Sequence, residues 1–370
     1  MGIRKRSMEG MGWLMLLDLS FYRGKHVFVT GHTGFKGSWL CNILVHSGAV
    51  VTGYSLPAPT TPNLFAISGI EAGMRSVIGD IRDIKQLSAA LKEARPEIVF
   101  HLAAQPIVRE SFRDPVTTFE TNIMGTVNLL ECIRQNQNIR SIVNITTDKV
   151  YLNDERSVGY REDDPLDGFD PYSNSKSCSE LVTHSYYHSF FHDSGTAVST
   201  VRAGNVIGGG DFAKDRILPD CVRAVSGGKP VLIRNPSSVR PYQHVLDALM
   251  AYLMIAQCQY ENSRYSGWYN VGPEEADCVS TAELVSLFCE QWGPDAKWEC
   301  RPQHNTPHEA SYLRLDCEKI KSVFGWRPVW NIRKAVELVC TWTRAWMDGK
   351  NIASEMDRET ADYLSLASRL

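Results

Sequence analysis

The chain has 370 residues, more than one typical domain needs, so it can hold a large domain together with a smaller lobe. Hydrophobic residues make up 43% of it and charged residues 22%, which excludes wholly disordered, collagen-like and low-complexity proteins. The 39 lysines and arginines nearly balance the 42 aspartates and glutamates, and the net charge of -3 argues against a broad surface for nucleic acid or an anionic membrane.

Residues 1–22 are predicted to form an N-terminal extension of the folded chain. A basic stretch, Arg4–Arg6, precedes an apolar run at residues 13–17, which Asp18 interrupts. This run is too short for a secretion signal, and no small-residue cleavage site follows it. No stretch reaches the ~18 apolar residues that would be needed to cross a bilayer.

From Lys25 onward, short β-branched runs alternate with longer amphipathic stretches, a pattern typical of β-α units in a parallel sheet. Buried strands are expected at residues 25–30, 49–54, 74–79, 97–103, 140–146 and 197–203. Helical spacing is found at residues 37–47, 83–94, 113–136 and 172–192. The sequence therefore predicts an α/β fold, with a Rossmann-like, doubly wound parallel sheet.

The domain organisation follows from where this regularity ends. Residues 23–204 are expected to form the dinucleotide-binding domain, which also carries the catalytic residues. Residues 205–350, with helical stretches at 245–260, 280–291 and 332–347, are expected to form a smaller C-terminal lobe that is partly interleaved with it. Residues 351–370 are expected to be a polar, partly mobile tail unless Tyr363 and Leu364 tether it.

A glycine-rich loop follows the first predicted strand and opens the first predicted helix. Glycines permit the tight turn and a close approach of the backbone, while the amide groups and dipole of the helix N-terminus stabilise a pyrophosphate. The GxxGxxG motif therefore predicts a dinucleotide site at Gly31, His32, Thr33, Gly34, Phe35, Lys36 and Gly37.

The remaining cofactor contacts are expected at the ends of the next strands. The second strand ends at Tyr54 and Ser55 without the carboxylate that usually binds the ribose, yet residues 38–74 hold no lysine or arginine for a 2′-phosphate. We therefore predict NAD rather than NADP, with a weaker anchor at the ribose. Asp80, beside Ile81, is placed to accept from the adenine amino group, with a turn-forming role as the alternative. The small residues that end the fourth strand are expected to lie against the cofactor: Leu102, Ala103 and Ala104.

Two further motifs point to catalysis. Tyr172 and Lys176 are four residues apart and therefore share one face of a predicted helix, where a cationic lysine is expected to lower the pKa of the phenol from its ordinary value near 10. Thr147, Asp148 and Lys149 follow the fifth strand and place a hydroxyl, a carboxyl and an amine at the ligand-binding edge of the sheet. A charged turn is the alternative interpretation of the second motif.

These motifs, together with Asn122 in the segment TNIMGT, resemble the extended short-chain dehydrogenase/reductases. The segments GHTGFKGSWL, VRAGNVIGGGDFAKDR, IRNPSSVRPYQHV and PHEASYLRLD are similar to those of the nucleotide-sugar dehydratases of that family, and the resemblance extends over most of residues 24–330. It implies a cytoplasmic hydro-lyase that acts on CDP-D-glucose with NAD and assembles as a homodimer or homotetramer. Another nucleotide-sugar 4,6-dehydratase, a 4-epimerase and a non-catalytic dinucleotide sensor remain the alternatives.

The resemblance also implies a role for each catalytic residue. Tyr172 would take the proton of the sugar 4-hydroxyl, and Lys176 would hold the nicotinamide ribose and tune the phenol. Thr147 would bind the C4 oxygen, Asp148 would protonate the departing 6-hydroxyl, and Lys149 would either remove the C5 proton or stabilise the enolate. Because a free lysine is protonated and a free aspartate ionised at neutral pH, the acid and base roles require a buried pocket.

The same resemblance suggests contacts for the nucleotide sugar. Asn205 and Arg240 would bind the diphosphate, since guanidinium groups form paired hydrogen bonds with phosphate. Arg109 and His308 would lie nearer the sugar or base, and the further candidates for substrate contact are Gln105, Arg216 and Arg234.

No metal site and no disulfide framework are predicted. His184, His188 and His192 recur every four residues on one predicted helix, but no cysteine or carboxylate pair completes a ligand set. The ten cysteines are scattered without a CxxC pair, which is typical of reduced thiols in a cytosolic protein.

Overall fold

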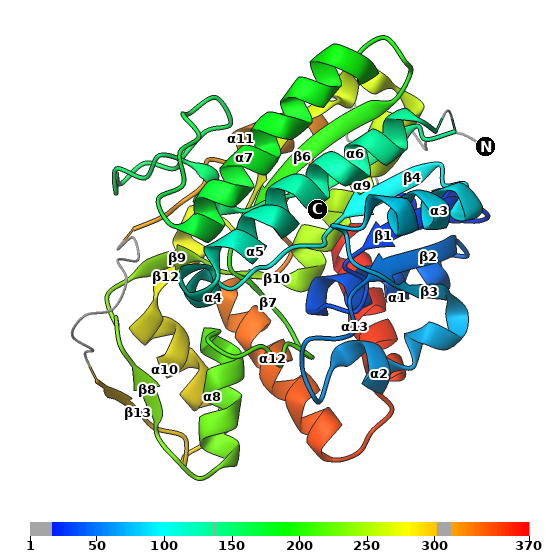
Figure 1. Ribbon diagram of the computed structural model, residues 1–370. Helices are drawn as coiled ribbons and strands as arrows, with labels where there is room; N and C mark the ends of the chain where they lie inside the picture. The colour runs from blue at the N-terminus through cyan, green and yellow to red at the C-terminus, as the bar shows by residue number, and fades with distance from the viewer. Residues whose placement is uncertain (1–16, 137, 302–311, 370) are drawn as a thin grey trace.

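A parallel sheet of seven strands forms the centre of the computed structural model, which describes residues 17–136, 138–301 and 312–369 (Figure 1). Each strand is parallel to its neighbours. The strands are β1 (His26–Thr30), β2 (Val50–Ser55), β3 (Arg75–Ile78), β4 (Ile98–His101), β5 (Ser141–Ile145), β6 (Ala197–Ala203) and β11 (Gly267–Val271).

The strand order β11-β6-β5-β4-β1-β2-β3 confirms the predicted doubly wound sheet. The chain runs from β1 outward to β3, then crosses to β4 and fills the other half of the sheet. In such sheets ligands bind where the order reverses, at the carboxyl ends of the strands, which here means the edge beside β1 and β4. Six strands match the predicted ones closely, whereas β11 was not predicted.

Helices cover both faces of this sheet. One face packs against α3 (Ile84–Ala94), α6 (Gly125–Arg134) and α7 (Pro171–Tyr186), with Phe28 of β1 pointing into that layer. The other face packs against α1 (Phe35–His46) and α9 (Val245–Glu261), with Val27 and Val29 pointing toward it, and α13 (Ile352–Ala367) packs on the outer side of α1. This alternation follows from the period of two in a strand, so each face of β1 is buried.

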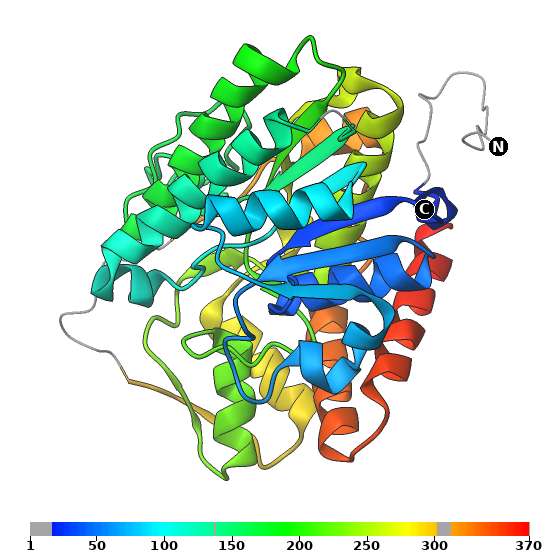
Figure 2. The ribbon, with the colours of Figure 1, turned by 45° about the vertical axis from the view of Figure 1, so that its right-hand side comes forward.

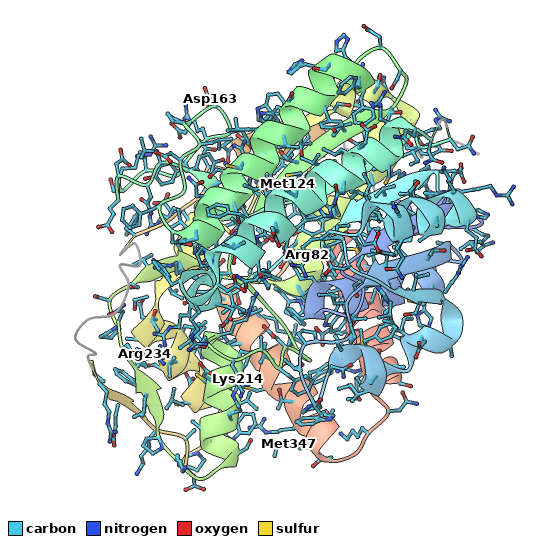
Figure 3. All side chains as sticks on the ribbon, in the orientation of Figure 1. Arg82, Met124, Asp163, Lys214, Arg234 and Met347 are labelled. Carbon is cyan, nitrogen blue, oxygen red and sulfur yellow. The ribbon has the colours of Figure 1, made fainter. Side chains whose placement is uncertain are left out.

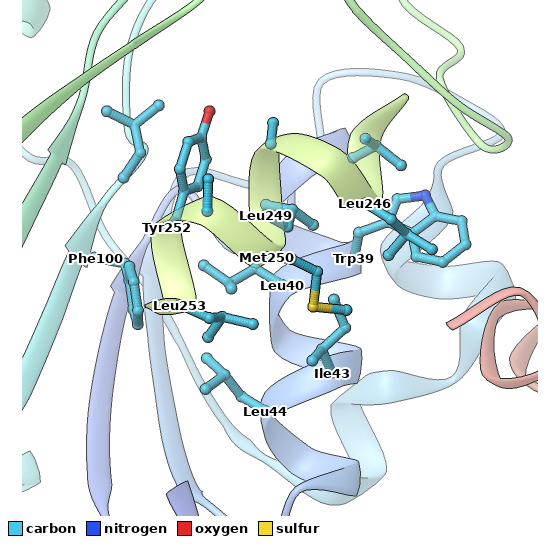
Figure 4. Close-up of a cluster of buried hydrophobic side chains, with 14 of the residues drawn as sticks. Trp39, Leu40, Ile43, Leu44, Phe100, Leu246, Leu249, Met250, Tyr252 and Leu253 are labelled. Atoms are coloured by element: carbon cyan, nitrogen blue, oxygen red, sulfur yellow. The ribbon is translucent and has the colours of Figure 1, made fainter. Parts of the chain in front are cut away.

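The largest apolar cluster lies between α1 and α9 (Figure 4). Trp39 and Leu40 of α1 are fully buried there, as are Leu249 and Leu253 of α9, and Phe100 contributes from β4. Residues are buried on all sides of α9, which is typical of a helix enclosed by protein rather than one at the surface. Helix α9 therefore lies inside the core that the sheet shares with the surrounding helices.

The predicted helix at 113–136 is broken into shorter pieces. This range holds α5 (Pro115–Phe119), a π-helical turn (η3, Glu120–Met124) and α6, and α4 (Val108–Arg113) comes directly before them. Pro115 lacks an N–H group and Asp114 caps α5 through its side chain, so a new helix starts there. The predicted helix at 172–192 is α7 followed by a second π-turn, η5 (Tyr187–Phe191).

A second lobe lies at the lower left of Figure 1. Its helices α8 (Ile217–Ser226), α10 (Thr281–Trp292) and α12 (Ile332–Met347) enclose a separate apolar cluster. Its strand pairs are β7 (Val206–Ile207) with β10 (Gln243–His244), β8 (Val231–Ile233) with β13 (Trp298–Cys300), and β9 (Val239–Pro241) with β12 (Cys278–Ser280). Two short helices remain, α2 (Leu64–Ser68) and α11 (Glu318–Phe324). None of the helices in the described part of the chain has the length and apolar character to cross a membrane.

The C-terminal residues form a docked helix rather than the polar, partly mobile tail that was expected. Asn351 caps α13, which lies along α1 at the edge of the molecule (Figure 2). Tyr363 is buried, as the alternative interpretation required, and its hydroxyl donates to Asp247 Oδ1 at 2.8 Å. Glu359 is also buried and lies 2.9 Å from His244 Nε2. Polar groups thus hold this helix in place together with apolar ones.

Replacing Asp247 with asparagine is expected to stabilise the protein relative to the wild type as the pH rises. Asp247 is fully buried, and burial raises its pKa from 3.8 to about 6. The folded state therefore binds this proton more tightly than the unfolded state, so the group's contribution is full below pH ~4 and is lost as the pH rises through 6.

The free energy of unfolding of Asp247→Asn, relative to wild type, should increase by about 1–2 kcal/mol between pH 5 and pH 8. Urea denaturation at several pH values measures this difference. A constant offset between the two proteins across that range would contradict the prediction, whatever the sign of the offset.

Candidate active site

The glycine loop between β1 and α1 is shaped for close approach of a ligand. Gly31 has φ +77°, and a Cβ there would come within 2.7 Å of the backbone nitrogen of Ala103. A Cβ on Gly37 would come within 2.1 Å of the carbonyl oxygen of Gly31, so the helix presses directly on the loop. Gly34 is the N-cap and has no side chain to cap the helix. The loop therefore fits a pyrophosphate at the N-terminus of α1.

Two side chains of this loop point into the protein and support it. His32 is fully buried, with its Nε2 2.8 Å from Ser76 Oγ, and burial lowers its pKa to about 4. Thr33 Oγ1 lies 2.7 Å from Ser55 Oγ. These side chains fix the loop against β2 and β3, and Phe35 lies beside Gly208 of the second lobe. The backbone of the loop is left for the ligand.

The residues predicted to contact the adenosine differ in how far their side chains are already bound to other groups of the protein. Ser55 stands at the end of β2, where its hydroxyl is shared with Thr33 and the carbonyl of Leu56. The Asp80 carboxylate is held by Arg82, whose Nε contacts both oxygens at 3.0 and 3.1 Å, and Arg82 lowers its pKa. Ile81 is buried against Gly125. Asp80 thus lies at the expected strand end, with an arginine already bound to it.

The end of β4 is tied to the strand beside it. Thr30 Oγ1 accepts from the backbone amides of Leu102 and Ala103 and lies 2.8 Å from His101 Nδ1. Leu102, Ala103 and Ala104 are all partly exposed at this edge. Asn122 is buried and bridges the main chain of Gln105 to Ser175 Oγ of α7. Asn122 therefore braces the segment beside the cofactor loop.

Tyr172 and Lys176 lie on α7, which starts at Pro171 with Asp170 as its N-cap. Both side chains are buried. Lys176 Nζ donates to the carbonyl of Ile145 at 3.1 Å, and burial lowers its pKa to about 8. Burial raises the pKa of Tyr172 to about 12, although a hydrogen bond with Thr147 and the charge of Arg216 oppose this.

The expected lowering of the phenol's pKa by Lys176 is therefore wrong for the protein without ligands. The spacing of four residues brings the two groups to one face of the helix, as predicted. However, loss of solvent around the phenol outweighs nearby positive charge.

The segment after β5 converges on one carboxyl group. Asp148 begins the short helix η4 (Asp148–Val150) and is fully buried. Its Oδ1 accepts from Thr147 Oγ1 at 2.9 Å and from Lys149 Nζ at 3.0 Å. Its Oδ2 accepts from Asn205 Nδ2 at 3.2 Å. The hydroxyl, carboxyl and amine of the predicted motif thus form one hydrogen-bonded group.

Lys36, which the sequence analysis placed only in the glycine loop, also belongs to this group of side chains. Burial and the charges of Lys176 and Arg216 lower its pKa to about 7, while Asp148 opposes that shift. Its Nζ lies 5.9 Å from the centre of the Tyr252 ring. The site collects positive charge, which suits an anionic substrate.

The predicted substrate residues are spread over a wider area. Arg109 Nη1 lies 3.3 Å from Asp215 Oδ1, and Arg216 Nε lies 3.9 Å from Asp211 Oδ2. The charge of Arg216 acts on Lys36 and Tyr172. The side-chain amide of Gln105 forms hydrogen bonds with Ile107 and Thr118, which are close to it in the chain. The buried Arg240 donates to the carbonyl of Val239. Arg234 follows β8 in the second lobe (Figure 3), and His308 lies outside the described residues.

Arg202 is a structural residue, although it lies in the segment VRAGNVIGGGDFAKDR, which is similar to those of the nucleotide-sugar dehydratases. It is fully buried, and its Nη2 lies 3.0 Å from Glu180 Oε2 on α7. His184 packs on Trp268 with ring centres 4.1 Å apart and lies 3.6 Å from Glu180. Within residues 17–136, 138–301 and 312–369 no three His, Cys, Asp or Glu side chains gather as a metal site would require.

The chain is similar to known proteins in sequence and in fold. A family model described as GDP-mannose 4,6 dehydratase matches residues 28–339. The chain is 48% identical over 360 residues to the CDP-glucose 4,6-dehydratase of Salmonella typhimurium strain LT2, which covers 96% of this chain and 100% of that protein.

Two solved structures share the fold. The UDP-glucose 4-epimerase of Thermus thermophilus, in complex with NAD, has a TM-score of 0.75 and 28% identity over 86% of this chain and 98% of its own. MoeE5, in complex with UDP-glucose and NAD, has a TM-score of 0.73 and 26% identity over 87% of this chain and 99% of its own. The chain therefore belongs to the GDP-mannose 4,6 dehydratase family, within the extended short-chain dehydrogenase/reductases that its motifs resemble.

Proposed function

We propose that this protein is a CDP-D-glucose 4,6-dehydratase, which converts CDP-D-glucose to CDP-4-dehydro-6-deoxy-D-glucose and water. The observation that carries the proposal is the convergence of Asp148, Lys149 and Tyr172 through Thr147, at the end of β5 and beside the glycine loop. The choice of a cytidine nucleotide is supported by the 48% identity to the Salmonella typhimurium CDP-glucose 4,6-dehydratase.

The resident cofactor of this proposal is NAD. When bound, NAD⁺ would supply a hydride acceptor for C4 of the sugar and, once reduced, a hydride donor for C6, so that the reaction would consume no external reductant. The loop at residues 31–37 offers the pyrophosphate a close backbone and a helix N-terminus. Residues 38–74 carry no lysine or arginine for a 2′-phosphate, which favours NAD over NADP.

The first chemical task of the protein is to remove the proton of the 4-hydroxyl. Tyr172 takes this proton, and Lys176, one turn along α7, is placed to hold the nicotinamide ribose. Because burial raises the pKa of Tyr172, the phenolate needs positive charge nearby, and Arg216 already acts in that direction. Thr147, hydrogen-bonded to the phenol, also lies where it can bind the C4 oxygen.

The second task is to remove water across C5 and C6. The new 4-ketone acidifies the C5 proton, which Lys149 removes while Asp148 protonates the departing 6-hydroxyl. Lys149 Nζ and Asp148 Oδ1 are 3.0 Å apart. Transfer of one proton across this contact leaves an uncharged amine and an uncharged acid, the two states that elimination requires. Lys149 then returns the proton to C5 as hydride reaches C6.

The direct test is a substrate panel with the purified protein. Incubation with CDP-, dTDP-, GDP- and UDP-glucose, and with GDP-mannose, is followed by mass spectrometry for loss of water and by detection of the 4-ketone. We expect dehydration of CDP-glucose at a rate at least tenfold above the other nucleotide sugars. Preferred dehydration of another nucleotide sugar would overturn the base assignment, and epimerisation without loss of water would overturn the reaction.

We further propose that the chain assembles as a homodimer, alone or within a homotetramer, through the helices α4 to α7. Apolar side chains are exposed along this face, and Figure 3 shows Met124 near its centre. Charged replacements there should prevent helix packing between copies, because they would be buried without partners. The exposed residues are Phe112, Val116, Met124, Leu181 and Phe190.

The double variant Met124→Glu and Leu181→Glu is expected to sediment with half the mass of the wild-type assembly or less. Analytical ultracentrifugation measures this, and Leu366→Glu on α13 serves as the control because Leu366 is exposed at a distant site. An unchanged mass would place the interface elsewhere.

A cytoplasmic location is also proposed. All ten cysteines lie within the described residues, and none of them forms a disulfide. Most are buried, and burial raises the pKa of several thiols, including Cys41 and Cys317. Free thiols in this number are typical of a reducing compartment. Fractionation of cells that express the protein tests this location.

A further inference from the structure

Asn205 stands at the point where the chain leaves the large sheet for the second lobe. It follows β6 and has φ +41°, a left-handed conformation that is uncommon outside glycine. Its carbonyl accepts from the amide of Gln243, and Gln243 Nε2 reaches the carbonyls of Gly204 and Val271. Hydrogen bonds from β10 thus hold the segment in this conformation.

This segment is pressed against the carboxyl group of Asp148. A Cβ on Gly204 would come within 1.9 Å of Asp148 Oδ2, so the glycine is what allows the carboxyl to lie there. The Asn205 amide completes the contact, with Nδ2 3.2 Å from the same oxygen. One oxygen of Asp148 is therefore enclosed by Gly204 and Asn205.

The other oxygen has a different set of partners. Asp148 Oδ1 contacts Thr147 Oγ1 and Lys149 Nζ, the groups that face the reacting part of the sugar in the proposed mechanism. Since a carboxyl group can rotate to exchange its two oxygens, something must determine which of them meets Lys149. The donor on Oδ2 supplies that constraint, because it binds Oδ2 as an acceptor whether or not Oδ1 is protonated.

We propose that Asn205 is a positioning residue for Asp148, which fixes Oδ2 so that Oδ1 alone exchanges a proton with Lys149 and delivers it to the departing 6-hydroxyl. This inference rests on the proposed dehydratase function. As the C6–O bond breaks, the proton on Oδ1 forms water with the hydroxyl, and Asp148 becomes a carboxylate. At the end of the reaction Tyr172 holds the proton from O4, and Lys149 has given its own proton to C5. Proton exchange with solvent returns both groups to their starting states.

The inference separates Asn205 from a role in binding the diphosphate, which the resemblance implies for it. A diphosphate contact acts on substrate affinity, whereas a contact with Asp148 acts on elimination after the ketone has formed. The first role therefore predicts a change in KM, and the second predicts a change in kcat.

The variant Asn205→Gly tests this, because glycine adopts the left-handed conformation without strain and the fold keeps its backbone. We expect kcat for CDP-glucose to fall by about 10²-fold, with the KM and the Kd for CDP within about twofold of wild type. In rapid mixing, reduced cofactor should accumulate in the variant, since C4 oxidation proceeds and elimination is slow. Asn205→Asp should lose at least as much kcat, because a second carboxyl can share the proton on Oδ2.

A substrate with fluorine in place of the 6-hydroxyl makes the readout specific to the acid. Fluoride departs with less help from a proton, so the deficit of Asn205→Gly should shrink to within about tenfold on this substrate. Arg95→Gly is the matched control, since Arg95 has φ +44° at the exposed end of α3, and its kinetics should be unchanged.

Three outcomes would overturn the inference. A KM or CDP Kd raised tenfold with kcat unchanged would assign Asn205 to the diphosphate. An equal loss of kcat on CDP-glucose and on the 6-fluoro substrate would show that Asn205 does not act through the acid Asp148. Unchanged kinetics of Asn205→Gly would show that Asn205 has no role in the reaction. Failure of the dehydratase proposal itself would be seen separately, as wild-type protein that does not dehydrate CDP-glucose.

Discussion

Replacement of Tyr172 with phenylalanine is expected to lower kcat by about 10²- to 10⁴-fold, the range for loss of a general base. The hydroxyl is the group that would take the proton of the 4-hydroxyl, and it is hydrogen-bonded to Thr147 inside the site. Phenylalanine keeps the buried ring, so the helix α7 and the position of Lys176 should be preserved. Initial-rate kinetics with CDP-glucose measure the change.

The step that fails should be the first one. Because hydride transfer from C4 requires removal of the hydroxyl proton, the variant should show no transient of reduced cofactor in rapid mixing. This differs from the Asn205→Gly variant, in which reduced cofactor should accumulate. The two variants together therefore separate oxidation at C4 from the loss of water.

The control is Tyr22→Phe, which also loses a buried hydroxyl. Tyr22 donates to the carbonyl of Leu253 at 2.6 Å, in the apolar layer and away from the site. This variant should lose about 1 kcal/mol of stability and keep its kcat. A Tyr172→Phe protein with more than a tenth of the wild-type kcat would remove Tyr172 as the base.

The sheet and the glycine loop were predictable because their signals are local. Val27 to Thr30 form a buried run followed at once by glycines, and the need for glycine at Gly31 and Gly37 is now seen in the backbone atoms that a Cβ would meet. The strand β11 was missed because its sequence, Gly-Trp-Tyr-Asn-Val, starts with glycine and holds a single β-branched residue, and only its last three residues are buried. It therefore lacks the β-branched run by which the other strands were recognised.

The C-terminal helix was missed for a related reason. Its buried face contains Glu359, a residue that predicts exposure when it is considered alone. The partner that allows its burial, His244, is over a hundred residues away in the chain. A contact between polar groups that are distant in the chain therefore accompanies the packing of a segment that was expected to be a tail.

At the site, the spacing of residues predicted proximity but not protonation. The spacing of four residues from Tyr172 to Lys176 places them on one face of α7, and this holds in the structure. The pKa of the phenol depends first on how completely the rest of the chain excludes water, and then on the nearby Thr147 and the charge of Arg216. The contact between Asn205 and Asp148 joins segments 57 residues apart, so only the fold reveals it.

Replacement of Glu180 with glutamine is expected to lower the free energy of unfolding by about 3–5 kcal/mol, the range for breaking a buried ion pair. Burial raises the pKa of Glu180, but Arg202 and the surrounding donors overcome this and hold it at about 2. Thr146 and Thr200 donate to its two oxygens at 2.5 and 2.6 Å. The variant leaves the Arg202 charge buried without its counter-charge.

The pH dependence has a definite sign. Because the folded-state pKa of Glu180 lies below its ordinary value of 4.5, its contribution is present above pH ~5 and is lost as the pH falls toward 2. Urea denaturation should therefore show a constant deficit for Glu180→Gln between pH 6 and 8, and a smaller one below pH 4.5. A deficit that grew on acidification would contradict this assignment.

The double variant Glu180→Met and Arg202→Met distinguishes stability from catalysis. Apolar side chains of similar volume often replace a buried ion pair at little cost, so stability should recover to within about 1–2 kcal/mol of wild type. The pair also joins α7, which carries Tyr172, to Thr146 of the strand end that carries Asp148. If this link sets the distance between the two groups, kcat should stay at least tenfold below wild type after stability returns. Full recovery of both would make the pair a purely structural one.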